Sequence, residues 1–112
     1  MSNRDDETSI SKAEKVMDAL QLIAGQIAKR VPVPPAQLMQ NFLGKGGLVT
    51  SLGDLFDKIE NKTAKLSDYG QVVADVLVVA GSVVVLAGGS PAILAAATAA
   101  GIATAAVKYF PE

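Results

Sequence analysis

The chain has 112 residues and a formal net charge of −1, so it fits a single domain and carries no charge excess that would attract nucleic acid. Half of its residues are hydrophobic, whereas cysteine, histidine and tryptophan are absent. The composition therefore excludes disulfides, the usual zinc ligands and the Ser-His or Cys-His pairs of nucleophilic enzymes, and we expect no metal or other cofactor.

Residues 1–8 are acidic and polar, which predicts a disordered tail before a single helical domain at 9–112. They lack the basic and apolar regions of a secretory signal, so we expect synthesis in the cytoplasm. After synthesis, the sequence is compatible both with association of the protein with a membrane and with its export by a dedicated machinery.

The first predicted helix covers about 11–30. Ser11 and Glu14 have the spacing of a capping box, in which both side chains satisfy free backbone donors at a helix start. Apolar residues then recur at helical intervals and align one face: Val16, Met17, Leu20, Ile23, Ala24 and Ile27. Lys29 and Arg30 suit the negative end of the helix dipole, so we expect the helix to end there, before a proline-rich connector.

Two shorter amphipathic helices follow. Pro35 suits the first position of a helix, and Gly44 is suited to end it. Ser51 and Asp54 repeat the capping-box spacing and predict another helix at about 51–61.

The longest uncharged run in the sequence has 32 residues and covers 76–107. Near its middle stand four residues that together favour a tight turn between two helices: Gly88, Gly89, Ser90 and Pro91. We therefore predict one helix before this turn, at about 67–87, and a second after it, at about 91–109.

Two β-branched clusters, 76–79 and 83–86, are also compatible with strands. The second half of the run is rich in alanine, which is a weak strand former and offers no suitable sheet partner. We therefore predict helices throughout the run.

Small residues occur four apart along the second of these helices, in two rows: Ala92, Ala96 and Ala100, and Ala97, Gly101 and Ala105. This spacing lets helix backbones approach closely, both in water-soluble bundles and within membranes. The rows predict that the helix packs tightly against a neighbour.

The sequence as a whole predicts an all-α fold, a small bundle of about five helices with a C-terminal hydrophobic helical hairpin. Amphipathic helices would occupy 9–66 and the hairpin 67–110. In plan, residues 71–110 resemble the hydrophobic hairpin inside pore-forming colicins, although no residue motif is shared. The resemblance implies a hairpin that is shielded in the folded protein and released at a membrane.

Two functional hypotheses follow from the hairpin. In the first, the protein is pore-forming or toxin-like, and the hairpin inserts into or associates with a membrane. In the second, the protein is a soluble interaction or assembly module, and the hairpin is its buried core or the interface of a homo-oligomer. In either case membrane lipid or a protein partner would contact the larger apolar side chains: Val76, Leu77, Val79, Val83, Val84, Leu86, Ile93, Leu94, Ile102 and Val107.

Asp75 directly precedes the uncharged run. An aspartate deep in a membrane helix costs roughly 2.5–3.5 kcal/mol on insertion scales, so its protonation would lower the cost of inserting the first hairpin helix. Our hypothesis is that Asp75 acts as an acid-sensitive latch, and the alternative is that it belongs to a polar end of the helix that stays near solvent. The other carboxylates and lysines form no catalytic pattern, and we expect no enzymatic activity.

Overall fold

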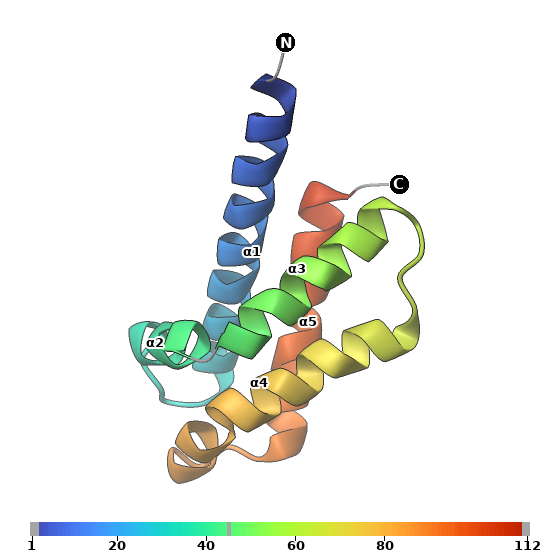
Figure 1. Cartoon of the computed structure of the whole chain (residues 1–112). Helices are drawn as coiled ribbons and strands as arrows, with labels where there is room; N and C mark the ends of the chain where they lie inside the picture. Colours follow the sequence, from blue (N-terminus) through green and yellow to red (C-terminus); the bar gives the residue numbers. More distant parts are fainter. Residues whose placement is uncertain (1–2, 45, 111–112) are drawn as a thin grey trace.

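The computed structural model describes residues 3–44 and 46–110 of the chain, with side chains from Lys12 onward. These residues form five helices and no strand, which confirms the predicted all-α bundle (Figure 1). The helices are α1 (Asn3–Arg30), α2 (Pro35–Gly44), α3 (Gly46–Glu60), α4 (Leu66–Leu86) and α5 (Pro91–Tyr109).

Helix α1 is longer than the sequence pattern predicts. It begins at Asn3, so residues 3–8 of the expected tail are helical, while residues 1–2 lie outside the described part of the chain. Acidic residues are favoured near a helix N-terminus, so the composition that predicts a tail is equally compatible with a longer helix. The other end agrees with the prediction, because α1 ends at Arg30 before the proline-rich connector.

Helix α3 begins at Gly46 and not near Ser51. The predicted capping box of Ser51 and Asp54 is therefore wrong, because Ser51 lies in the second turn and its hydroxyl donates a hydrogen bond to Asp75 on α4. The reason lies in tertiary packing. Leu48 is fully buried in the core, and its burial favours helix even next to glycine.

Both halves of the uncharged run are helical, so the strand alternative is wrong. The start of α4 is held by Asp68, whose carboxylate accepts a hydrogen bond from the backbone N–H of Lys65 at 2.8 Å. Helix α5 has the predicted bounds.

The turn between α4 and α5 also agrees with the prediction. Gly88 has a φ of +97°, a left-handed conformation that favours glycine. The Ser90 hydroxyl accepts a hydrogen bond from the Ile93 N–H at 3.2 Å and caps α5, while Pro91 occupies the first helical position. These residues connect the two apolar helices into the predicted hairpin.

Helix α5 packs along α1 and against α4, which crosses it (Figure 1). It lies close to α1 at Gly101, where an added Cβ would lie 2.7 Å from the Cα of Ile23. The hairpin is thus not an isolated pair, because α5 packs more extensively on α1 than on α4.

Only one of the two small-residue rows takes part in this close packing. The buried row consists of Ala97, Gly101 and Ala105. The other row lies at the surface, with Ala92 and Ala96 exposed and Ala100 half-buried.

The apolar core includes residues from all five helices. Helix α4 contributes one narrow stripe of fully buried residues with four-residue spacing: Val72, Val76, Ala80 and Val84. Because a single stripe covers a small part of a helix surface, much of this apolar helix is left outside the core.

Candidate functional site

The ten predicted contact residues differ in burial. Four lie in the core: Val76, Val84, Leu94 and Ile102. Three are half-buried at its edge: Leu77, Val79 and Val83. Three are exposed: Leu86, Ile93 and Val107. In the folded bundle the first group cannot reach a lipid or a partner, so these four side chains become available only if the hairpin leaves α1, α2 and α3.

The structure adds three exposed apolar residues that the sequence pattern does not single out, all on α4: Leu66, Val78 and Val85. Val78 and Val85 are seven residues apart and therefore share a face of the helix. Since α4 is apolar on every side after Asp75, hydrophobic periodicity cannot separate its inward face from its outward face. Only the packing of the other helices identifies which valines point outward.

We call the exposed Ala, Val, Leu and Ile residues of α4 and α5 within the uncharged run 76–107 the outer hairpin faces. On α4 they are Val78, Val85 and Leu86, and on α5 they are Ala92, Ile93, Ala96, Ala99, Ala103 and Val107. Only 22% of the most apolar window of α4 and 33% of that of α5 is buried. Helices that served only as a core would be mostly buried, so these two helices present an unusual amount of uncharged apolar surface.

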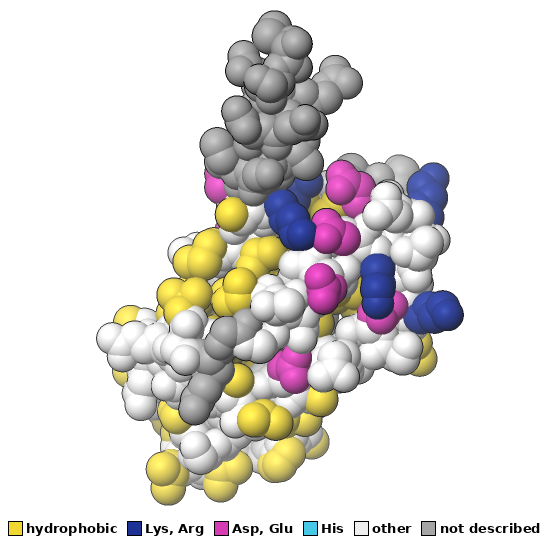
Figure 2. All heavy atoms as spheres, in the orientation of Figure 1, with side chains coloured by type: hydrophobic (Ala, Val, Ile, Leu, Met, Phe, Trp, Pro, Cys, Tyr) yellow, Lys and Arg dark blue, Asp and Glu magenta, His cyan; other side chains and the backbone are white. Residues whose placement is uncertain are grey.

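The hairpin tip, defined as residues 85–93, is part of this surface. Figure 2 shows hydrophobic side chains at the lower end of the molecule, where Figure 1 places the C-terminal end of α4 and the turn into α5. Charged side chains gather instead over α3 and the adjoining part of α4 (Figure 2). The face in view therefore has an apolar end and a charged end.

Asp75 lies half-buried at the contact between α3 and α4. The Ser51 hydroxyl donates a hydrogen bond to Asp75 Oδ2, and Gln71 Nε2 donates one to Oδ1 at 3.1 Å. A small cleft of about 100 Å³ adjoins this pair, and its lining includes three charged residues: Asp54, Lys58 and Asp68. Both oxygens of the Asp75 carboxylate are thus hydrogen-bonded, and one of these bonds connects α4 to α3.

The C-terminal end of α5 is held on α1 by Asp18. Lys108 Nζ lies 3.0 Å from Asp18 Oδ2, and the Tyr109 hydroxyl donates to the same oxygen at 2.9 Å. The hydrogen bond from Lys108 lowers the pKa of the Asp18 carboxyl, as does the bond from Tyr109, although partial burial opposes them. The contact therefore depends on an ionised Asp18.

Phe110, which follows α5, packs between α3 and α1. Its ring centroid lies 5.5 Å from that of Phe56 on α3, and Lys15 Nζ on α1 lies 4.8 Å from its centre. An ion pair at 2.6 Å between Lys12 and Asp57 joins the same two helices. These contacts fix the end of α5 that is opposite to the hairpin tip.

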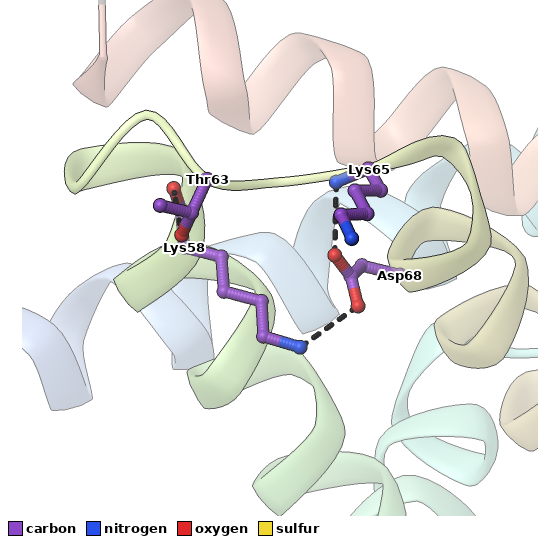
Figure 3. Close-up of polar contacts among 4 residues, drawn as sticks. All are labelled: Lys58, Thr63, Lys65 and Asp68. Carbon is purple, nitrogen blue, oxygen red and sulfur yellow. Dashed lines mark hydrogen bonds and ion pairs between the residues drawn. The ribbon is translucent and has the colours of Figure 1, made fainter.

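The start of α4 is connected to the end of α3 by a further ion pair. Figure 3 shows Lys58 reaching Asp68, with Lys58 Nζ 2.8 Å from Oδ1, beside Thr63, whose hydroxyl donates to the Lys58 carbonyl oxygen at 3.4 Å. The hydrogen bond with Asp68 and the attraction to its charge raise the pKa of Lys58. The ion pairs to the hairpin thus involve the N-terminal end of α4 and the C-terminal end of α5, far from the tip.

Among the described residues, no group of three or more metal-binding side chains is placed to hold an ion. No family model, curated protein or solved structure matches the chain. The geometry of the chain itself therefore carries the functional argument: two apolar helices with uncharged outward faces, connected to the rest of the bundle by polar contacts away from their shared tip.

Proposed function

We propose that the protein is a non-enzymatic helical protein that associates with membranes, and that the α4–α5 hairpin inserts into the bilayer in a pore-forming or toxin-like manner. The observation that carries this proposal is the exposure of the outer hairpin faces, where Val78, Leu86 and Val107 are 82%, 88% and 73% exposed. Removal of such side chains from water is favourable, and these side chains are already accessible to lipid in the folded bundle.

The lengths of the two helices suit this role. Helix α4 has 21 residues and α5 has 19, so at about 1.5 Å per residue each covers roughly the 30 Å of a hydrocarbon core. Both pass a length and composition test for membrane spans, with mean hydropathy values of 1.9 and 1.5. The test alone is weak support, because core helices of soluble proteins also pass it, and it gains weight from the low burial of both helices.

Two threonines of α5 are compatible with a lipid environment. Thr98 donates a hydrogen bond to the Leu94 carbonyl oxygen at 2.7 Å, and Thr104 donates one to the Ala100 carbonyl oxygen at 2.8 Å. These bonds lie within one helix, so insertion would not break them. The polar groups that insertion must expose are therefore concentrated at Asp75 and at the ends of the two helices.

Asp75 supports a regulated form of insertion. If α4 leaves α3, the carboxylate loses its bond from Ser51, and an ionised aspartate in the membrane costs roughly 2.5–3.5 kcal/mol. Protonation removes that charge. In this proposal Asp75 favours the folded bundle at neutral pH and permits insertion in acid.

The proposal is tested by replacing an outward valine of α4. We expect Val78→Asp to leave the fold intact, because the side chain is exposed, and to reduce dye release from liposomes by roughly 100-fold, because a charge near the centre of a span disfavours insertion. Leu66→Asp is the matched control, since Leu66 is similarly exposed, at 88%, but is the first residue of α4. Circular dichroism with and without liposomes verifies the folding of both variants.

Equal loss of release in the two variants would contradict insertion of α4, as would a parent protein that ignores liposomes. The second result would favour the alternative, a soluble interaction or assembly module. That alternative is supported by the continuous core, in which Val76 and Val84 of α4 and Ile102 of α5 are already buried. It predicts a cooperative monomer or small homo-oligomer in sedimentation experiments, unchanged by lipid.

A further inference from the structure

The acidic residues of the chain are absent from two long stretches of the sequence. No Asp or Glu occurs at 19–53 or at 76–107. The charged residues in these stretches are all basic, namely Lys29, Arg30 and Lys45, of which Lys45 lies outside the described residues. The near-neutral net charge of the chain therefore conceals a separation between basic and acidic regions.

The fold brings these two stretches together at the hairpin tip. A Cβ built on Gly89 would lie 2.9 Å from Val31 Cγ2, so the residue that follows Arg30 touches the α4–α5 turn. The connector after Val31 forms one wall of a cleft of about 250 Å³, and the end of α4, including Leu86, forms the other. Lys29 and Arg30 are exposed and directly precede Val31 in the chain, so the C-terminal end of α1 that carries them lies next to the tip.

Neither basic residue is neutralised by a carboxylate within the part of the chain that the structure describes. Arg30 Nη1 donates to the carbonyl oxygen and to the side-chain oxygen of Gln26, both at 2.9 Å, and these acceptors are uncharged. Of the six described lysines away from the tip, three form ion pairs with aspartates: Lys12, Lys58 and Lys108. The positive charge at the C-terminal end of α1, next to the tip, is thus available to an anionic partner.

We propose that the hairpin tip docks on an anionic phospholipid surface, with Lys29 and Arg30 at the headgroup phosphates and Leu86 and Val85 entering the interface. This inference rests on the proposed function, because it states which end of the hairpin meets the membrane and which lipid it selects. Exposed apolar side chains flanked by unpaired basic ones are the combination that holds proteins at anionic membrane surfaces. The acidic residues at the other end orient the molecule by repulsion from the same surface.

The test measures binding of the full-length protein to phosphatidylcholine vesicles with and without phosphatidylglycerol, at low and at high salt. We expect Lys29→Gln/Arg30→Gln to weaken binding to the anionic vesicles by about 30-fold at low salt, since each basic residue near such a surface contributes about a fivefold factor. The matched control is Lys62→Gln/Lys65→Gln, which removes the same charge from two exposed residues before α4. We expect a change of less than about twofold for this control.

A second pair tests the apolar part of the tip. Leu86 and Leu66 are both 88% exposed and lie at opposite ends of α4. We expect Leu86→Gln to weaken binding roughly tenfold and Leu66→Gln to have little effect, because only Leu86 is transferred from water into the interface. Thermal unfolding of each variant establishes that the fold is retained.

The two proposals fail in different ways. If the parent protein binds neither kind of vesicle, the proposed function fails and the docking inference fails with it. If the parent inserts and releases dye but binds both vesicle types equally, or if the two charge variants lose equal affinity, the docking inference alone is overturned.

Discussion

Gly101 determines how closely α5 approaches α1, because a Cβ at this position would lie 2.7 Å from the Cα of Ile23. A Cβ cannot lie that close to a non-bonded Cα, and a backbone yields less easily than the end of a side chain. The contact is buried and belongs to the row of small residues that the sequence pattern identifies. At this position the small residue is required by packing against another helix, whatever the environment of the hairpin.

We expect Gly101→Ala to destabilise the folded protein by about 1–3 kcal/mol, because overpacking outweighs the gain in helix propensity. Gly81→Ala is the control, since Gly81 is also inside an apolar helix but an added Cβ meets no atom within 4 Å. This control should be neutral or stabilising by up to about 1 kcal/mol. Denaturant unfolding measures both changes, and an unchanged stability of Gly101→Ala would show that α1 and α5 can separate without cost.

At the scale of the helices, local residues explain which boundaries the sequence predicts. Pro35, Gly88, Ser90 and Pro91 each act through their own backbone or a capping bond, and the helix boundaries beside them agree with the structure. The start of α3 depends on burial of Leu48 by other helices, so the local capping-box pattern is misleading there.

The sequence also could not predict which face of α4 is buried, because this too depends on packing against the other helices. Its inward stripe and its outward face are both made of apolar residues, so Val76 and Val78 are equivalent in sequence, although the first is buried and the second is exposed. The same limit applies to the neighbours of α5. The sequence predicts close packing of a small-residue row but contains no local indication that α1 is the partner.

The contact between Asp18 on α1 and Lys108 on α5 leads us to predict how the stability of the fold changes in acid. The pKa of Asp18 is lowered from its ordinary value of 3.8, chiefly by the hydrogen bond from Lys108. A carboxyl whose pKa is lower in the folded state than in the unfolded state stabilises the fold above the unfolded pKa, and that stabilisation is lost as the pH falls through the folded value. The contribution of Asp18 is therefore complete at neutral pH and begins to decline below about pH 4.

We expect Asp18→Asn to lower the free energy of unfolding at neutral pH by less than about 1 kcal/mol, because the pair is partly solvated. The difference from the parent should vanish in strong acid, where Asp18 is protonated in both states. Glu14→Gln, one turn earlier on the exposed side of α1, is the control. A difference between Asp18→Asn and the parent that is constant from acid to neutral pH would contradict an ionic role for Asp18.

At the scale of the whole molecule, the arrangement of polar and apolar groups along the hairpin suggests how it could be released. Ion pairs and aromatic contacts hold the ends of α4 and α5 that lie far from the tip, and Asp75 connects the middle of α4 to α3. The tip itself carries apolar side chains, and the basic C-terminal end of α1 lies next to it. An opening that begins at the tip would therefore reach the polar contacts last, with Asp75 as the first acidic group to leave its partners.

This order predicts the behaviour of Asp75→Asn. For the parent protein we expect liposome binding to rise as the pH falls, because protonation of Asp75 removes the cost of placing its charge in the membrane. The asparagine variant should bind liposomes at neutral pH nearly as strongly as the parent binds them in acid. At neutral pH its binding should therefore be roughly 100-fold stronger than that of the parent.

Asp75→Asn removes the charge of Asp75 and also changes its hydrogen bond to Ser51, and Ser51→Ala distinguishes these two effects. It removes the hydroxyl that donates to Asp75 but leaves the carboxylate in place. If the charge of Asp75 opposes insertion, Ser51→Ala keeps the pH dependence of the parent, with a small increase in binding from the lost bond. If the bond to α3 alone holds the hairpin, Ser51→Ala binds at neutral pH as well as Asp75→Asn does. Identical pH profiles for Asp75→Asn and the parent would refute any role of Asp75 in release, because neither the charge nor the bond would then limit how α4 reaches the lipid.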